Sequence, residues 1–201
     1  MWDIIEAAGW PIWPLIFTSV FGLAIIIERM WMLRANLIAP SSLLNDVEKM
    51  VSQGQIKKDV ISNLREHSML GEIFASALNN FNNSPEIIKE AIEEAGRSVN
   101  HKLEKHLSTL ATIATVAPLL GLFGTIIGMV ELFSSFTSSG HDVAVFARGI
   151  SVALYNTAGG IVVAVPAMIA YRFYRSKVDN LVMEMEQQAI KLVEIISGKR
   201  N

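Results

Sequence analysis

Three long stretches of the sequence contain no charged side chain and are separated by mixed polar segments. They cover residues 7–27, 107–130 and 149–171. A helix needs about 20 apolar residues to cross the hydrocarbon core of a bilayer. The pattern therefore predicts an all-α membrane protein with three transmembrane helices. The first stretch follows Asp3 and Glu6, whereas a cleavable signal peptide begins with basic residues, so we expect this helix to be retained.

The charged residues beside these stretches predict the orientation of the chain. Basic residues follow the first stretch, precede the second and follow the third: Arg29, Arg34, Lys102, Lys105, Arg172, Arg175 and Lys177. The other ends of the stretches carry Asp3, Glu6, Glu131, Asp142 and a single basic residue, Arg148. Because basic flanks remain in the cytoplasm, we expect a periplasmic N-terminus and a cytoplasmic C-terminus in the inner membrane of a bacterium.

Five segments are expected along the chain. Residues 1–34 form the first transmembrane helix, and residues 35–84 form short cytoplasmic helices near 42–53, 57–67 and 70–81. Ser84 and Pro85 are typical of a helix start, and the apolar stripe after them predicts one long helix over 85–136 that includes the second span. Residues 137–142 form a periplasmic turn. Residues 143–197 form the third span and a C-terminal helix, so that helices two and three extend far into the cytoplasm.

The composition argues against several classes of function. The chain has a net charge of −2, no cysteine and four histidines that lack metal-ligand spacing. These features give no basic surface for nucleic acid and no thiolate site. No nucleophile–base pair is visible, so we expect no enzyme activity, no metal and no cofactor. The expected surroundings are a lipid bilayer and other proteins.

Rows of small residues mark the second and third stretches. They comprise Gly121, Gly124 and Gly128 in the second stretch and Gly149, Ala153 and Gly160 in the third. Small residues let helices approach closely, which is one interpretation. The other is that these faces line a shared lumen, because the uncharged polar residues Thr125, Asn156 and Thr157 accompany them. The two interpretations carry equal weight on the sequence alone.

Charge inside the spans is absent, and charge at their outer ends is sparse. Glu131 and Arg148 are equally far from the middle of the outer turn, so we predict that they pair near the outer membrane face. No carboxylate lies within a stretch, although a proton carrier near the membrane midplane is usually an Asp or Glu. If the chain conducts protons, a partner must supply the acid.

Two segments resemble a known family. The segment LATIATVAPLLGLFGTIIG at 110–128, and GISVALYNTAGG at 149–160 followed by AVPA at 164–167, look like the second and third spans of the ExbB/TolQ proteins, with MotA more distant. The resemblance implies a homo-pentamer around the single spans of a dimeric ExbD- or TolR-like partner that carries the protonatable Asp. It implies that proton flow drives that partner, and through it a TonB- or TolA-like protein. It also implies that Thr125 and Thr157 line the pore.

One position departs from the family pattern. Many ExbB and TolQ chains have a Glu in the third span where this chain has Val152, which cannot titrate. The leading hypothesis is a stator subunit of a proton-driven motor, closer to ExbB than to TolQ. A passive membrane scaffold for a single-span partner is the alternative that Val152 permits. A self-contained channel is disfavoured because no acid lies within the spans.

Overall fold

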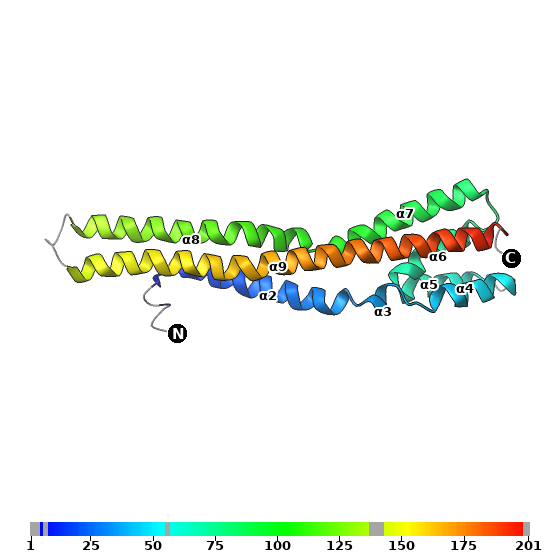
Figure 1. Cartoon of the computed structure of the whole chain (residues 1–201), viewed down its shortest axis with the longest axis horizontal. Coiled ribbons are helices and arrows are strands. Elements are labelled where there is room, and N and C mark those ends of the chain that lie inside the picture. Colours follow the sequence, from blue (N-terminus) through cyan, green and yellow to red (C-terminus); the bar gives the residue numbers. More distant parts are fainter. Residues whose placement is uncertain (1–4, 6–7, 55–56, 137–142, 199–201) are drawn as a thin grey trace. The chain divides into compact units, whose positions relative to one another are not determined.

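The computed structural model describes residues 5, 8–54, 57–136 and 143–198, and these residues form helices and no strands. The helices are α2 (Ile12–Met32), α3 (Ala35–Ile38), α4 (Leu43–Ser52), α5 (Lys58–His67), α6 (Met69–Asn79), α7 (Pro85–Glu104), α8 (Leu107–Phe136) and α9 (Val143–Ile196) (Figure 1). Three helical stretches are long and apolar enough to cross a membrane. The predicted fold class is therefore confirmed. The outer turn predicted at 137–142 lies outside the described residues.

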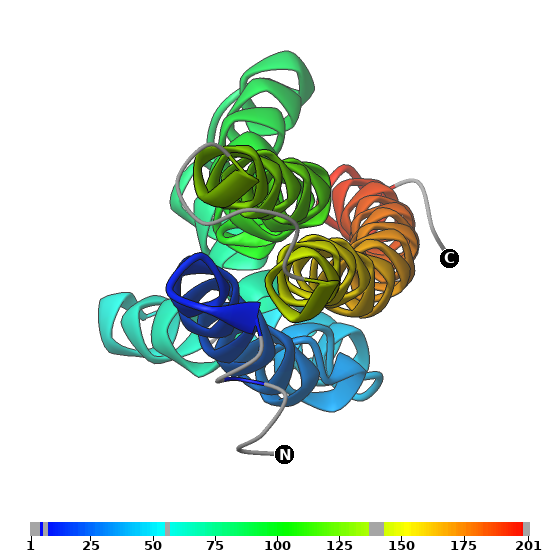
Figure 2. The same ribbon diagram turned by 90° about the vertical axis from the view of Figure 1, so that its left-hand side faces the viewer.

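The first of two compact units comprises residues 1–28 and 106–173. It contains most of α2, all of α8 and the first part of α9, which lie beside one another (Figure 2). Its interior is built from small and branched side chains: Ala8, Ile12, Leu15, Ala117 and Ala164. Large apolar side chains face outward instead, such as Phe17 at 75 % and Val162 at 70 % exposure. This inverted distribution is what a bundle surrounded by lipid requires, since lipid tails are as apolar as the side chains.

The start of α2 differs from the predicted start of the apolar stretch. The helix begins at Ile12 and continues to Met32, whereas the charge-free stretch covers residues 7–27. Gly9 adopts a φ of +71°, a conformation that favours glycine, and Pro11 cannot donate a backbone hydrogen bond. The chain therefore enters the helix through a non-helical turn, and Ala8 packs in the interior of the unit.

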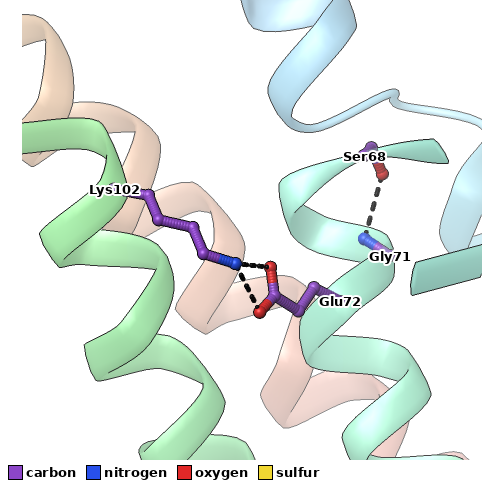
Figure 3. A network of polar contacts seen from close by, with 4 residues as sticks. All are labelled: Ser68, Gly71, Glu72 and Lys102. Atoms are coloured by element: carbon purple, nitrogen blue, oxygen red, sulfur yellow. Dashed lines mark hydrogen bonds and ion pairs between the residues drawn. The ribbon is translucent and has the colours of Figure 1, made fainter. Parts of the chain in front are cut away.

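The second unit comprises residues 29–105 and 174–201 and contains α3 to α7 with the C-terminal part of α9. The bounds of α4, α5 and α6 match the short helices predicted from the sequence. Ser68 accepts a hydrogen bond from the Gly71 amide at 2.9 Å and so caps α6. Lys102 of α7 donates to both carboxylate oxygens of Glu72 at 2.7 Å (Figure 3). The contacts of Lys102 with Glu72 join α6 to α7.

The single helix predicted over 85–136 is interrupted. Its parts, α7 and α8, are separated by Lys105 and His106, and His106 adopts a φ of +63°. Since one left-handed residue is enough to end the α7 hydrogen-bond ladder, that prediction was wrong at this point. In the second unit, the Arg29 guanidinium donates to the carbonyl oxygen of Leu103 in the last turn of α7 at 3.3 Å. By contrast α9 is one helix of 54 residues, as the repeat of apolar residues indicated.

Candidate functional site: the seam between α8 and α9

The two longest spans of the first unit meet backbone to backbone. A Cβ atom added to Gly121 would lie 2.8 Å from the carbonyl oxygen of Asn156 and 3.2 Å from the Cα atom of Gly160. A Cβ atom added to Gly160 would lie 2.7 Å from the carbonyl oxygen of Ala117. All three distances are shorter than a van der Waals contact, so no side chain fits at either position. The seam is therefore closed by main-chain packing at its centre.

The seam continues toward the C-terminal end of α8 and the N-terminal end of α9. A Cβ atom on Gly128 would lie 3.0 Å from the carbonyl oxygen of Gly149 and from the amide nitrogen of Ala153. A Cβ atom on Gly149 would lie 2.7 Å from the Leu132 Cβ atom. Together with Gly121, Gly124 and Gly160, these residues lie on the facing sides of α8 and α9. The arrangement supports the helix-packing interpretation of the small residues.

Asn156 lies inside the unit. Its side chain is fully buried, and its Nδ2 group donates to the carbonyl oxygens of Ala8 and Val152, both at 2.8 Å. A Cβ atom on Gly124 would lie 2.4 Å from the Asn156 Cβ atom, so Gly124 provides the space for this side chain. The predicted pore-lining position of Asn156 does not match this burial. The residue joins α9 to the segment before α2.

The position of this contact explains why an amide is needed. Gly124 precedes Glu131, where the charge-free stretch of α8 ends, by seven residues or about 10 Å along the helix. Ala8 and the non-helical turn that follows it therefore lie inside the apolar layer. Backbone polar groups at that depth must find partners in the protein, because lipid offers none. The Asn156 amide supplies a donor to the Ala8 carbonyl.

Thr125 and Thr157 lie at the edge of the seam. Both are half-buried, and their hydroxyl groups donate to carbonyl oxygens of their own helices, Leu122 at 2.6 Å and Ala153 at 3.3 Å. Each hydroxyl oxygen keeps acceptor capacity after donating its proton. The two side chains can therefore accept a hydrogen bond from a group outside this chain.

The direction of both threonines follows from their neighbours. Two residues before Thr125, the Phe123 ring packs edge-on against Trp10 at a centroid distance of 6.2 Å. Two residues after Thr157, a Cβ atom on Gly159 would lie 3.4 Å from the Ile12 side chain. A two-residue step turns a helix by about 200°. Thr125 therefore lies about 160° away from Phe123, which faces the turn before α2, and Thr157 lies about 160° away from Gly159, which faces α2. Both threonines therefore lie on the side of the seam that α2 leaves uncovered, and we call this side the threonine face.

The remaining predicted residues lie apart from the threonine face or inside the seam. Glu131 and Arg148 are exposed, and their pairing stays a prediction. Val152 is 5 % exposed, and its Cγ1 atom would lie 3.2 Å from a Cβ atom on Gly128. Within the described residues, no group of three or more His, Asp or Glu side chains could hold a metal ion.

The sequence did not predict the contact between Ala8 and Asn156. The acceptor is a main-chain carbonyl, which every residue carries, so no residue type marks it. Gly9 and Pro11, residue types that often mark a turn, are the signal that could have indicated one before α2. The fold and this seam define a membrane protein whose second and third spans are closely packed and whose small polar groups face outward on one side.

Comparisons with known proteins agree with that class. Residues 65–187 match the model of the MotA/TolQ/ExbB proton channel family. The chain is 34 % identical over 81 % of its length to ExbB-like 3 of Synechocystis sp., and covers 79 % of that protein. It is 25 % identical over 90 % of its length to the biopolymer transport protein exbB1 of Vibrio cholerae, and covers 82 % of it.

A third relative, ExbB-like 1 of Synechocystis sp., is 29 % identical over 82 % of this chain. The chain covers 66 % of that relative, slightly less than two thirds of its length. The chain belongs to the MotA/TolQ/ExbB proton channel family.

Proposed function

We propose that the chain is the housing subunit of a proton-driven motor in the inner membrane, with its N-terminus periplasmic and its C-terminus cytoplasmic. Five copies surround the single spans of a dimeric ExbD- or TolR-like partner, and the partner supplies the protonatable Asp. The work of the motor reaches a TonB-like protein, or a TolA-like protein if the chain serves the Tol-Pal system.

The threonine face is the observation that carries the proposal. Thr125 and Thr157 are half-buried at the seam edge opposite α2, where a helix from another protein can approach both α8 and α9. Their hydroxyl oxygens can accept a hydrogen bond from a protonated carboxyl group. The charge-free stretches of this chain contain no acid, so the proton carrier comes from the partner. This chain thus forms the housing, and the partner provides the residue that carries the proton.

Partner-dependent uptake across the outer membrane, measured together with proton flux in vesicles, tests the proposal. We expect Thr157→Val to abolish both activities, because valine keeps the shape but removes the hydroxyl group. Thr157→Ser keeps the hydroxyl group and should retain most of the flux. Thr18→Val is the matched control, because Thr18 of α2 also donates to a carbonyl of its own helix, Pro14 at 2.7 Å. Full activity of Thr157→Val and Thr157→Ala would show that the threonine face has no part in conduction.

A non-conducting scaffold for a single-span partner is the second candidate. The buried Val152 side chain favours it, because this position in α9 cannot exchange a proton. The two candidates differ in one measurement. Vesicles that contain the chain and its partner should conduct protons if the chain is a motor housing, and they should remain as tight as empty vesicles if it is a scaffold.

A further inference from the structure

A cationic pocket lies in the second unit where α2 has just ended. Its volume is about 470 Å³, and Arg34, Ala35, Asn36, Leu37 and Lys177 line it. Two of these five residues carry a positive charge and none carries a negative charge. Two cations that share one pocket repel each other unless an anion lies between them. The lining therefore favours an anionic ligand.

The acidic residue closest to the pocket along α9 faces elsewhere. Asp179 is only two residues from Lys177, but that step turns the helix by about 200°. Its carboxylate lies 3.5 Å from Arg175 Nε, and the Arg175 guanidinium also pairs with Glu104. The nearby carboxylates are thus engaged with Arg175, and the positive charge of the pocket is not neutralised by them.

The residues beside the pocket are typical of a membrane interface. Trp31 and Met32, at the end of α2, are 61 % and 48 % exposed, and Leu37 in the pocket wall is 61 % exposed. Tryptophan is enriched at the level of the lipid headgroups. Arg34 follows the last residue of α2 by two positions, and Lys177 follows the charge-free stretch that ends at residue 171 by six. Long basic side chains at such positions extend to the headgroup layer.

We propose that this pocket binds the phosphate group of an anionic phospholipid. Arg34 and Lys177 contact the phosphate oxygens, the Asn36 side chain donates to the headgroup, and Leu37 with Trp31 contacts the first methylene groups of the acyl chains. A soluble phosphate offers the same charge but no acyl chain, so the exposed apolar residues favour the lipid. The site goes beyond the proposed motor function, because it requires only that the chain spans a membrane.

Native mass spectrometry of the complex purified with its partner tests the site. The delipidated complex is titrated with phosphatidylglycerol and, separately, with uncharged phosphatidylcholine of the same acyl chains. We expect phosphatidylglycerol to be retained preferentially. Each basic side chain near an anionic lipid contributes a factor of about five, so Arg34→Gln with Lys177→Gln should lower this retention about twenty-five-fold. The charge-conserving Arg34→Lys variant should lose little.

Lys191→Gln is the matched control. Lys191 lies on nearly the same face of α9 as Lys177 but about 21 Å farther along the helix, so its loss should not change lipid retention. The proposal is overturned if the double variant retains phosphatidylglycerol like the parent complex, or if Lys191→Gln lowers retention equally. It is also overturned if millimolar inorganic phosphate displaces the lipid, because the ligand is then a soluble anion. Circular dichroism of each variant confirms that its helix content is unchanged.

Discussion

The same glycine-to-alanine substitution should have opposite effects at two positions of this chain. Gly121 lies in the seam between α8 and α9, where an added Cβ atom would meet main-chain atoms at 2.8 and 3.2 Å. Gly96 lies within α7, where an added Cβ atom would meet nothing within 4 Å. Both glycines are interior helical residues, so the intrinsic helix preference changes equally. The difference between the two variants therefore reports packing alone.

Two effects set the expected changes in the free energy of unfolding: the helix preference of alanine over glycine and the overpacking of the seam. Replacing glycine by alanine in a helix interior stabilises by about 1 kcal/mol, and Gly96→Ala should gain about that much. At Gly121 the neighbours are backbone atoms that no rotamer change can move, so α8 and α9 must separate. Overpacking of this kind costs about 1–3 kcal/mol. After the helix gain is subtracted, we expect Gly121→Ala to lower the free energy of unfolding by up to about 2 kcal/mol and to be about 1–3 kcal/mol less stable than Gly96→Ala.

Reversible unfolding of the purified chain in mixed micelles, followed by the helical circular dichroism signal, measures both changes. Gly96→Ala should shift the midpoint to higher denaturant and Gly121→Ala to lower. A stability of Gly121→Ala equal to that of Gly96→Ala would refute the close approach of the two backbones. The difference in the free energy of unfolding between the two variants reports this packing even if micelles weaken all helix contacts.

Three further substitutions test other contacts. Asn156→Leu removes the donor to the Ala8 carbonyl and should cost about 1–2 kcal/mol in the same unfolding assay; an unchanged midpoint would mean that the amide is dispensable. Lys102→Gln breaks the contact with Glu72 and should cost about 1 kcal/mol at low salt, with the difference shrinking as salt rises; a salt-independent loss would contradict an electrostatic cause. Gly71→Ala places a Cβ atom against the backbone of α5 and should cost about 2 kcal/mol or more, and normal thermal stability of this variant would contradict the α5–α6 packing.

The periodicity of apolar residues was enough to predict most of the helices. The three charge-free stretches each overlap a helix long enough to cross a membrane, although α2 begins and ends five residues later than its stretch. Helices α4, α5 and α6 begin and end close to their expected residues. Such patterns succeed because burial on one helix face repeats every three to four residues. Such patterns do not predict where a single residue leaves the helical conformation and ends a helix. The apolar stripe continues through His106, so nothing in the pattern shows that this residue adopts a left-handed conformation and ends α7.

The candidate site was predicted only in part. Small residues at positions 121, 124, 128, 149 and 160 indicated close packing, because only helix contact or a lumen explains such rows in an apolar stretch. The sequence could not decide which side of each helix the first span covers. For that reason Asn156, Thr125 and Thr157 were grouped together. The structure separates them, because Asn156 faces the turn before α2 and the two threonines face the opposite side.

Crosslinking to the partner from the threonine face tests the central claim most directly. A photoreactive residue is placed at position 157, and a second variant carries it at position 155, where Tyr155 is 41 % exposed and about 160° away around α9. The chain is expressed together with its single-span partner and irradiated in membranes. We predict a crosslink from position 157 to the span of the partner and none from position 155. Crosslinks from position 155 alone, or from neither position, would contradict a housing in which the threonine face surrounds the proton carrier.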